Sequence, residues 1–155
     1  QKVQGLRRTG VADAASVAAL ATASPPRGLV AGGEPTRIEV DLRRQVLLFW
    51  RDGSLARVLP VSTGSGRRYC VAGRCERALT PVGTFRVTRK VPGVDRGPLG
   101  TLYDPMYFNR GVAIHGAPSV PAFPASHGCV RIPMYAAPSF ARQVPLGTPV
   151  YVLAS

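Results

Sequence analysis

The chain has 155 residues, of which 45% are apolar, so it is long enough for one domain with its own core and too apolar for wholesale disorder. No run of about 18 apolar residues occurs, which excludes a membrane span in this stretch. The net charge of +12 favours an anionic neighbour, such as nucleic acid, an acidic membrane face or an anionic wall polymer. However, the arginines are scattered with few aromatic residues between them, which favours a solvated basic surface over specific nucleic-acid binding.

The first 36 residues predict a short helix followed by a linker. Asp13 is a candidate N-cap, and Val17 and Leu20 repeat on one face of the expected helix. A single short helix cannot bury its own apolar stripe, so it must pack on the following domain or on another segment. Residues 24–36 are rich in proline and glycine, which is typical of a linker. The chain does not begin with methionine, so a missing leader carries no information about the compartment.

A β meander is predicted next. Residues 38–42 alternate apolar and acidic side chains, which is the period of a half-buried strand. Arg43 and Arg44 provide a turn before the apolar run 45–50, which reads as a more fully buried strand. Asp52 and Gly53 then form a hairpin signal ahead of the next strand, residues 55–63.

The second half predicts further strands and one or two small helices. Residues 80–90 give a strand with Phe85 and Val87 inward, residues 111–116 give a short strand that ends near His115, and residues 148–154 close the chain as a strand. Residues 133–144 are helical in composition, although Pro138 must either break that helix or start a second one. About six strands with little helix indicate a mainly β, mostly antiparallel domain, either a sandwich or a partly closed barrel.

Two of the three cysteines, Cys70 and Cys75, lie close together in a segment rich in glycine, serine and arginine. As a disulfide they would close a very small loop, which is worth about 2 kcal/mol by chain entropy. The alternative is two free thiols in a reducing compartment. The disulfide is favoured because it would organise a segment of flexible composition, and it would leave Cys129 as the odd cysteine in an oxidising compartment.

Cys129 lies within fifteen residues of both histidines, His115 and His127. An ordinary cysteine has a pKa of about 8.5, and a neighbouring imidazole can take its proton or stabilise the thiolate, as in covalent acyl transfer. Gly128 permits a sharp backbone approach, so the N–H groups of Gly128 and Cys129 are candidates to face a developing oxyanion. One such donor is worth about 3 kcal/mol of barrier.

Two other interpretations of this cluster stay open. His115, His127 and Cys129 are zinc-ligand types, but the usual short spacing of ligand pairs is missing, so no metal or other cofactor is expected. The cluster could also be a buried thiol with two satisfied core histidines. The second histidine at a strand end and the glycines that follow both histidines favour the catalytic interpretation.

The segment "IHGAPSVPAFPASHGCVRI" resembles the active-site signature of the L,D-transpeptidases, the YkuD-type catalytic domain of bacterial cell-wall enzymes. The flanking "TPVGTFRV" and "VPLGTPVYV" match as well, so the resemblance covers about residues 37–154. It implies a β-sandwich with one or two short helices and a capping loop, located outside the cytoplasm. The expected organisation is therefore a catalytic domain over residues 37–155, preceded by the linker and by a helical segment over residues 1–23.

The resemblance also implies a role for each matching residue. Cys129 is the nucleophile, His115 the general base, and His127 orients the site or stabilises charge. Ser126 braces His127 or the loop, and Gly128 completes the catalytic set.

Four further residues are implied to bind substrate. Arg131 would bind a carboxylate of the substrate peptide. Tyr103 and Tyr107, just before the histidine strand, would form the wall that covers the substrate. Gly116 is the fourth residue expected to bind substrate.

This sequence departs from the family pattern in three places. The stretch between His115 and Ser126 is shorter than in well-described members, the Cys70–Cys75 insert is not a family constant, and Pro138 interrupts the helix that follows the cysteine. None of these changes removes a catalytic group. Residues 1–21 are in addition similar to the second half of a peptidoglycan-binding repeat, which would make the first helix the remnant of a wall-binding module.

The function implied is acyl transfer on peptidoglycan stem peptides. Cys129 would attack the carbonyl between the diamino acid at position three and D-alanine at position four, and the thioester would pass to an acceptor amine. Carbapenems are expected to acylate Cys129. The alternatives are an L,D-carboxypeptidase that uses water as acceptor and a non-catalytic wall-anchoring module. The protein is expected in the cell wall or a periplasm-like space, secreted or membrane-anchored through a missing leader, with its oligomeric state open.

Overall fold

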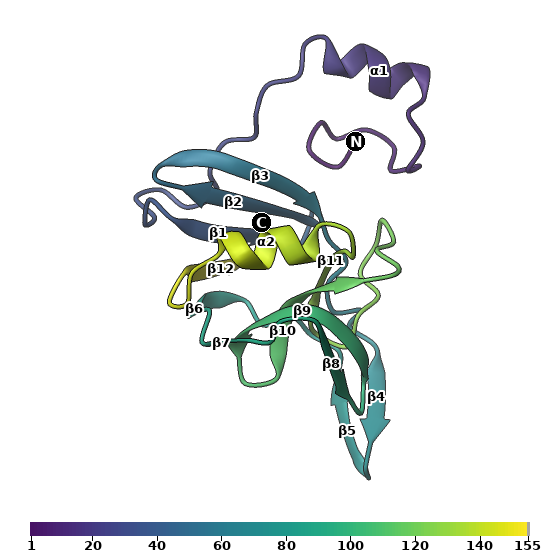
Figure 1. The fold of residues 1–155 in the computed structure, drawn as a ribbon. Helices are drawn as coiled ribbons and strands as arrows, with labels where there is room; N and C mark the ends of the chain where they lie inside the picture. Colours follow the sequence, from purple (N-terminus) through teal and green to yellow (C-terminus); the bar gives the residue numbers. More distant parts are fainter. Residues whose placement is uncertain (155) are drawn as a thin grey trace.

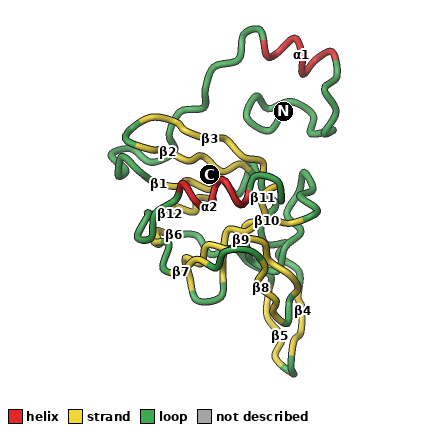
Figure 2. The backbone as a smooth tube through the Cα atoms, in the orientation of Figure 1, coloured by secondary structure: helices red, strands yellow, loops and turns green. Residues whose placement is uncertain are grey.

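The computed structural model describes residues 1–154. Figure 1 shows a mainly β domain with an N-terminal extension, and Figure 2 shows how little of it is helical. In chain order the elements are α1 (Ala14–Leu20), β1 (Arg37–Asp41), β2 (Val46–Arg51), β3 (Ser54–Pro60), β4 (Arg68–Val71), β5 (Arg74–Arg77), β6 (Gly83–Arg86), β7 (Arg89–Lys90), β8 (Val94–Gly97), β9 (Gly100–Asn109), β10 (Val112–Ala117), β11 (Val130–Pro133), α2 (Ala137–Gln143) and β12 (Pro149–Leu153).

The first sheet has the order β3-β2-β1-β12-β6 and contains the predicted meander. β1 and β2 pair antiparallel with Ile38 opposite Phe49, while β12 returns to run parallel beside β1. The β2–β3 turn has Asp52 and Gly53 at φ 51° and 80°, the left-handed conformations that a two-residue hairpin turn requires. The Asp-Gly signal in the sequence therefore predicted this turn correctly.

The second sheet has the order β11-β10-β9-β7, and β8 also pairs with β9. β10 and β11 run parallel, with Ile114 opposite Val130 and His115 opposite Arg131. The fold therefore has two parallel strand pairs within a sheet system that is otherwise antiparallel, as expected. The described residues form twelve strands rather than about six, because several strands have only two to four residues and show no alternation in the sequence.

The core lies between the two sheets, so the predicted mainly β sandwich is confirmed. Phe49 of the first sheet meets Phe140 of α2 edge to face at 5.4 Å between ring centroids. Pro138 lies in the first turn of α2, where a missing N–H costs nothing, so this proline starts the helix. Val87 is fully buried and Phe85 packs against the core, as their inward positions predicted.

Two parts of the chain extend away from this sandwich. The β4–β5 hairpin projects from one end, and α1 lies at the other end, connected to β1 through residues 21–36 (Figure 1). Asp13 caps α1 by accepting the Ser16 N–H, as predicted, but α1 buries none of its residues and Leu20 is 74% exposed. Among residues 1–154, neither helix is long and apolar enough to cross a membrane.

Candidate active site

Parallel pairing of β10 and β11 sets the directions of the key side chains. Ile114, Val130 and Ile132 are buried in the core. Because side chains alternate along strands, the neighbouring His115, Cys129 and Arg131 face the other side of the sheet. All three line one cavity of about 450 Å³. Two strands joined by residues 118–129 thus bring a thiol, an imidazole and a guanidinium to a common cavity.

The Cys129 sulfur lies at the wall of this cavity. It accepts a hydrogen bond from the Ala113 N–H at 3.4 Å, and Sγ lies 3.9 Å from the Gly111 carbonyl oxygen, which can accept the thiol proton. Burial raises the pKa of the Cys129 thiol above its ordinary value, and the Ala113 N–H and the charge of Arg131 oppose this rise. The resting group is therefore a neutral thiol at pH 7.

His115 is almost completely buried, with 6% of its surface exposed. Its Nδ1 lies 2.8 Å from the Gly116 carbonyl oxygen. A carbonyl can only accept, so Nδ1 carries the proton and Nε2 keeps its lone pair. Burial lowers the pKa of His115, and the charge of Arg131 lowers it further against the opposing effect of the Gly116 carbonyl. His115 is therefore a neutral imidazole with one nitrogen able to accept a proton.

The loop 126–129 is held by the side chain of Ser126. Its Oγ donates to the Cys129 carbonyl at 2.5 Å and accepts from the Gly128 N–H at 3.0 Å. The Gly128 amide is therefore already bonded, which corrects the expectation that it faces an oxyanion; a serine side chain commonly captures the N–H two residues ahead. The Cys129 N–H donates to no atom of residues 1–154 and is the amide that stays available.

Gly128 has a structural reason to be glycine. Its φ is +138°, and a Cβ at this position would lie 3.0 Å from the Leu79 carbonyl oxygen. The Gly128 carbonyl accepts a hydrogen bond from the Thr80 hydroxyl at 2.7 Å, and that hydroxyl accepts from the Gly64 N–H at 2.8 Å. Sequence reasoning did not identify Thr80 as a site residue, because it lies almost fifty residues from the cysteine and begins a segment, "TPVGTFRV", that was interpreted only as a turn and a strand.

His127 is exposed and packs against Tyr69, with ring centroids 5.0 Å apart in an edge-to-face arrangement. The pair lines the Cys129 cavity and also a second cavity of about 290 Å³ that includes Arg67 and Arg68. His127 and Tyr69 thus line both cavities, which lie next to each other at this pair. Tyr69 was not expected at the site, since its segment read only as a flexible insert.

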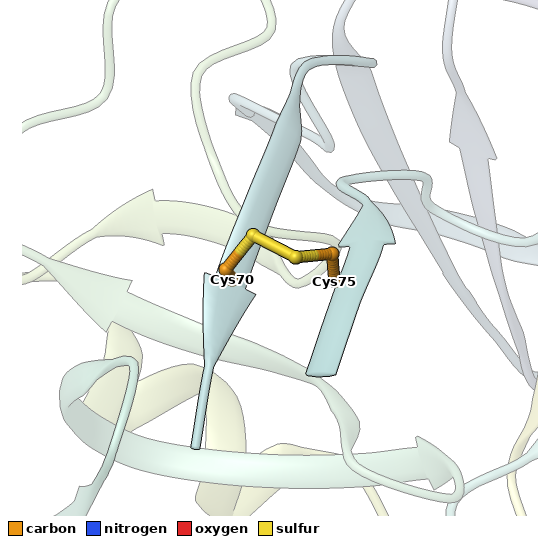
Figure 3. Close-up of a disulfide and its surroundings, with 2 residues drawn as sticks. All are labelled: Cys70 and Cys75. Carbon is orange, nitrogen blue, oxygen red and sulfur yellow. A yellow bond between two sulfur atoms is a disulfide. The ribbon is translucent and has the colours of Figure 1, made fainter. Parts of the chain in front are cut away.

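The segment that carries Tyr69 is the β4–β5 hairpin, stapled by a disulfide between Cys70 and Cys75 (Figure 3). The two cysteines are directly opposite each other, and the next pair along the hairpin is Tyr69 with Glu76. Neighbouring pairs point to opposite faces, so the disulfide lies on one face while Tyr69 and Glu76 share the other. Glu76 lines the Cys129 cavity together with Tyr69.

Three of the expected substrate-binding residues do not line the Cys129 cavity. The Tyr107 hydroxyl donates to Asp95 at 2.7 Å, and Arg89 stacks on its ring. Tyr103 pairs with Gly116, and a Cβ on Gly116 would lie 2.7 Å from Cβ of Ala137, so Gly116 allows α2 to pack closely. The expected tyrosine wall is therefore replaced by Tyr69 and by residues 99–102 of the β8–β9 hairpin.

Arg131 does line the cavity, and within residues 1–154 its guanidinium forms no ion pair. Among the same residues, no group of three or more histidine, cysteine or acidic side chains has an arrangement that could hold a metal ion. The site thus combines a thiol, a neutral imidazole, an unbonded backbone amide and a free guanidinium. This set can carry out nucleophilic attack on a carbonyl next to a carboxylate.

Residues 35–152 match the L,D-transpeptidase catalytic domain family, YkuD. The chain belongs to this family. Among solved structures, the chain is similar to an L,D-transpeptidase from Xylanimonas cellulosilytica, with 36% identity and a TM-score of 0.87 over 99% of this chain and 76% of that one. The first helix and the linker lie within that match, but nothing in the match identifies a peptidoglycan-binding repeat.

Two further L,D-transpeptidase structures share the fold at lower identity. An enzyme from Mycobacterium smegmatis is 25% identical with a TM-score of 0.64, over 79% of this chain and 60% of that one. The Ldtfm–avibactam carbamoyl enzyme is 28% identical with a TM-score of 0.63, over 79% of this chain and 50% of that one. The chain thus spans between half and three fifths of these two structures. No curated protein matches the chain.

Proposed function

We propose that this chain is a cysteine acyltransferase that acts on peptidoglycan stem peptides outside the cytoplasm. Family membership supports the reaction class, and the cavity shared by Cys129, His115 and Arg131 supports the assignment of these residues to it. The single observation that carries the proposal is that Cys129 and His115 line the same cavity.

In the first half-reaction, Cys129 Sγ bonds to the carbonyl carbon of the diamino acid at position three of the stem. Nε2 of His115 takes the thiol proton and delivers it to the amine of the departing D-alanine as the peptide bond breaks. The Cys129 N–H donates to the carbonyl oxygen while it carries negative charge. Arg131 binds a carboxylate of the donor stem, and Ser126 keeps the loop in shape.

In the second half-reaction, an amine of another stem attacks the thioester carbonyl. His115 accepts the amine proton and returns it to the departing Cys129 sulfur, which restores the thiol and leaves a new amide between the two stems. His127, in contact with Tyr69, orients this side of the site. Carbapenems are proposed to acylate the same sulfur. An imipenem complex of one L,D-transpeptidase, 22% identical to this chain, and an avibactam carbamoyl form of another, 28% identical, support this.

The test is mass spectrometry of the protein incubated with a purified disaccharide-tetrapeptide. The expected result is a Cys129 adduct that lacks D-alanine, followed by dimeric muropeptide, with neither product from the Cys129→Ala variant. Free tripeptide without dimer would indicate hydrolysis by an L,D-carboxypeptidase instead. If the wild-type protein forms no adduct with either the tetrapeptide or a carbapenem, the proposal fails in favour of a non-catalytic wall-anchoring module.

A further inference from the structure

Glu76 is unusual among the acidic residues of this strongly basic chain. Four of the eight acids form ion pairs with arginine, namely Glu34, Glu39, Asp41 and Asp95. Three more accept hydrogen bonds from backbone N–H groups or a threonine hydroxyl, namely Asp13, Asp52 and Asp104. Within residues 1–154, Glu76 has neither kind of partner and accepts only the Tyr69 hydroxyl at 3.4 Å.

The hairpin directs this carboxylate to the site. The Cys70–Cys75 disulfide fixes the pairing of β4 with β5, and this register places Glu76 directly opposite Tyr69 on the face that lines the Cys129 cavity. Arg68 and Arg77 flank this pair along the hairpin, yet neither ion-pairs with Glu76. A carboxylate left exposed beside a nucleophile, in a chain with 20 cationic side chains, is available to a cation from outside.

The same cavity contains an unpaired charge of the opposite sign, the guanidinium of Arg131. A wall that offers one free anion and one free cation is complementary to a zwitterion, whose ammonium and carboxylate groups each need a partner of opposite charge. Peptidoglycan stems that contain a diamino acid carry both groups close together.

We propose that Glu76 is a specificity-determining residue that binds a primary ammonium group of the stem peptide in the Cys129 cavity. This inference rests on the proposed function for the identity of the substrate. The ammonium comes either from the diamino acid of the donor stem or from the amine of the acceptor stem before it loses its proton. Tyr69 positions the carboxylate by donating to it, and the disulfide keeps the two side chains opposite each other.

The first test measures binding in the Cys129→Ala background, where no chemistry occurs. Calorimetry compares a tetrapeptide stem that has a free amine on its diamino acid with the same stem after acetylation of that amine. Loss of one hydrogen bond to a charged group predicts that the Glu76→Gln variant binds the free-amine stem about tenfold more weakly than the Cys129→Ala parent does. The parent should bind the acetylated stem about tenfold more weakly than the free-amine stem. Acetylation should change nothing further once Glu76 is replaced.

Asp52→Asn is the matched control. It makes the same change in net charge on the β2–β3 turn, away from the cavity, and asparagine tolerates the positive φ of that position. The control should bind both stems as the Cys129→Ala parent does. Equal affinity of the parent and the Glu76→Gln variant for the free-amine stem, or no binding of either stem, overturns the inference.

Kinetics with Cys129 intact then separates the two sources of the ammonium. If the donor supplies it, Glu76→Gln slows adduct formation by the tetrapeptide about tenfold; if the acceptor supplies it, adduct formation is unchanged and about tenfold more acceptor is needed to form dimer. No change in either step overturns the inference. The Glu76→Gln variant could bind the free-amine stem more weakly while the protein with Cys129 intact forms no adduct. That result would contradict the acyltransferase proposal and still support ammonium binding by Glu76.

Discussion

Substitution of Thr80 tests whether its hydroxyl holds the loop 126–129 in place. It joins the Gly64 N–H on one side to the Gly128 carbonyl on the other, and Thr80 is only 8% exposed. Thr80→Val keeps the shape of the side chain but removes both hydrogen bonds. Thr80→Ser removes a methyl group and keeps both.

The expected cost follows from the two groups that lose their partner. Each unpaired buried group costs about 1–3 kcal/mol, and the half-buried Gly64 is partly rehydrated by water, so Thr80→Val should lower the free energy of unfolding by about 2–3 kcal/mol. For a chain of this length that corresponds to a Tm lower by roughly 4–12 °C. Because the freed carbonyl is next to the nucleophile, acylation of Cys129 by a carbapenem should slow about ten- to hundredfold.

Thermal denaturation and intact-mass kinetics measure these two effects separately. Thr80→Ser should keep the wild-type acylation rate and lose only the stability that its missing methyl group accounts for. Equal Tm values and equal rates for the valine and serine variants would refute the role of the hydroxyl. A valine variant with a lower Tm but a normal rate would show that Ser126 alone shapes the loop.

Three other predictions concern the pH profile, the glycine and the disulfide. Burial raises the pKa of the Cys129 thiol and lowers that of His115 from their ordinary values, so at pH 7 the attack starts from the thiol with His115 as a neutral base. Carbapenem acylation should therefore be level between pH 7 and 8 and fall only on the acid side, below the ordinary pKa of histidine at about 6.5. Gly128→Ala should cost about 1–3 kcal/mol in backbone strain and slow the reaction, as measured by denaturation and adduct kinetics. Replacing Cys70 and Cys75 with serine should speed amide hydrogen exchange through β4 and β5 about 30-fold and leave β1 and β12 unchanged.

A different result would contradict each of these three predictions. A rate that falls between pH 8 and 7 with the slope of one proton and then stays flat to pH 5 would mean that His115 is not the base. Gly97→Ala is the control for Gly128→Ala, because Gly97 is at an open position without a positive φ. An equal loss of stability and rate in Gly97→Ala would contradict the explanation by backbone strain. Unchanged exchange in the double serine variant would mean that the hairpin holds its register without the disulfide.

The gathering of Cys129 and both histidines at one cavity, and most of the long strands, could be predicted because their signals are local. The hairpin turn at Asp52 and Gly53, the cap at Asp13 and the inward Val87 follow from short-range rules of backbone conformation and alternation. The Ser-His-Gly-Cys motif indicates the family within four consecutive residues.

The walls of the site could not be predicted in this way, since they depend on which hairpin folds over the cysteine. Tyr69 and Glu76 lie more than fifty residues before it, in strands of four residues without alternation. The tyrosines of β9 were misplaced because that strand is irregular. Asp104 has φ 46° in the middle of it, and the pairing with β10 shifts register twice, so a position just before the histidine strand does not tell which face each tyrosine takes.

The charge of Arg131 acts on both Cys129 and His115, which the sequence motif does not reveal. Its charge lowers the pKa of both Cys129 and His115, so it favours the thiolate and disfavours the imidazolium at the same time. A resting thiolate–imidazolium pair is therefore not stabilised as a unit, and the proton must leave sulfur during the attack. A donor carboxylate that neutralises Arg131 would remove its effect on the imidazole and make His115 a stronger base once the substrate is bound. In the resting site, burial is the largest cause of both shifts and keeps the thiol and the imidazole neutral, while Arg131 reinforces the effect only on His115.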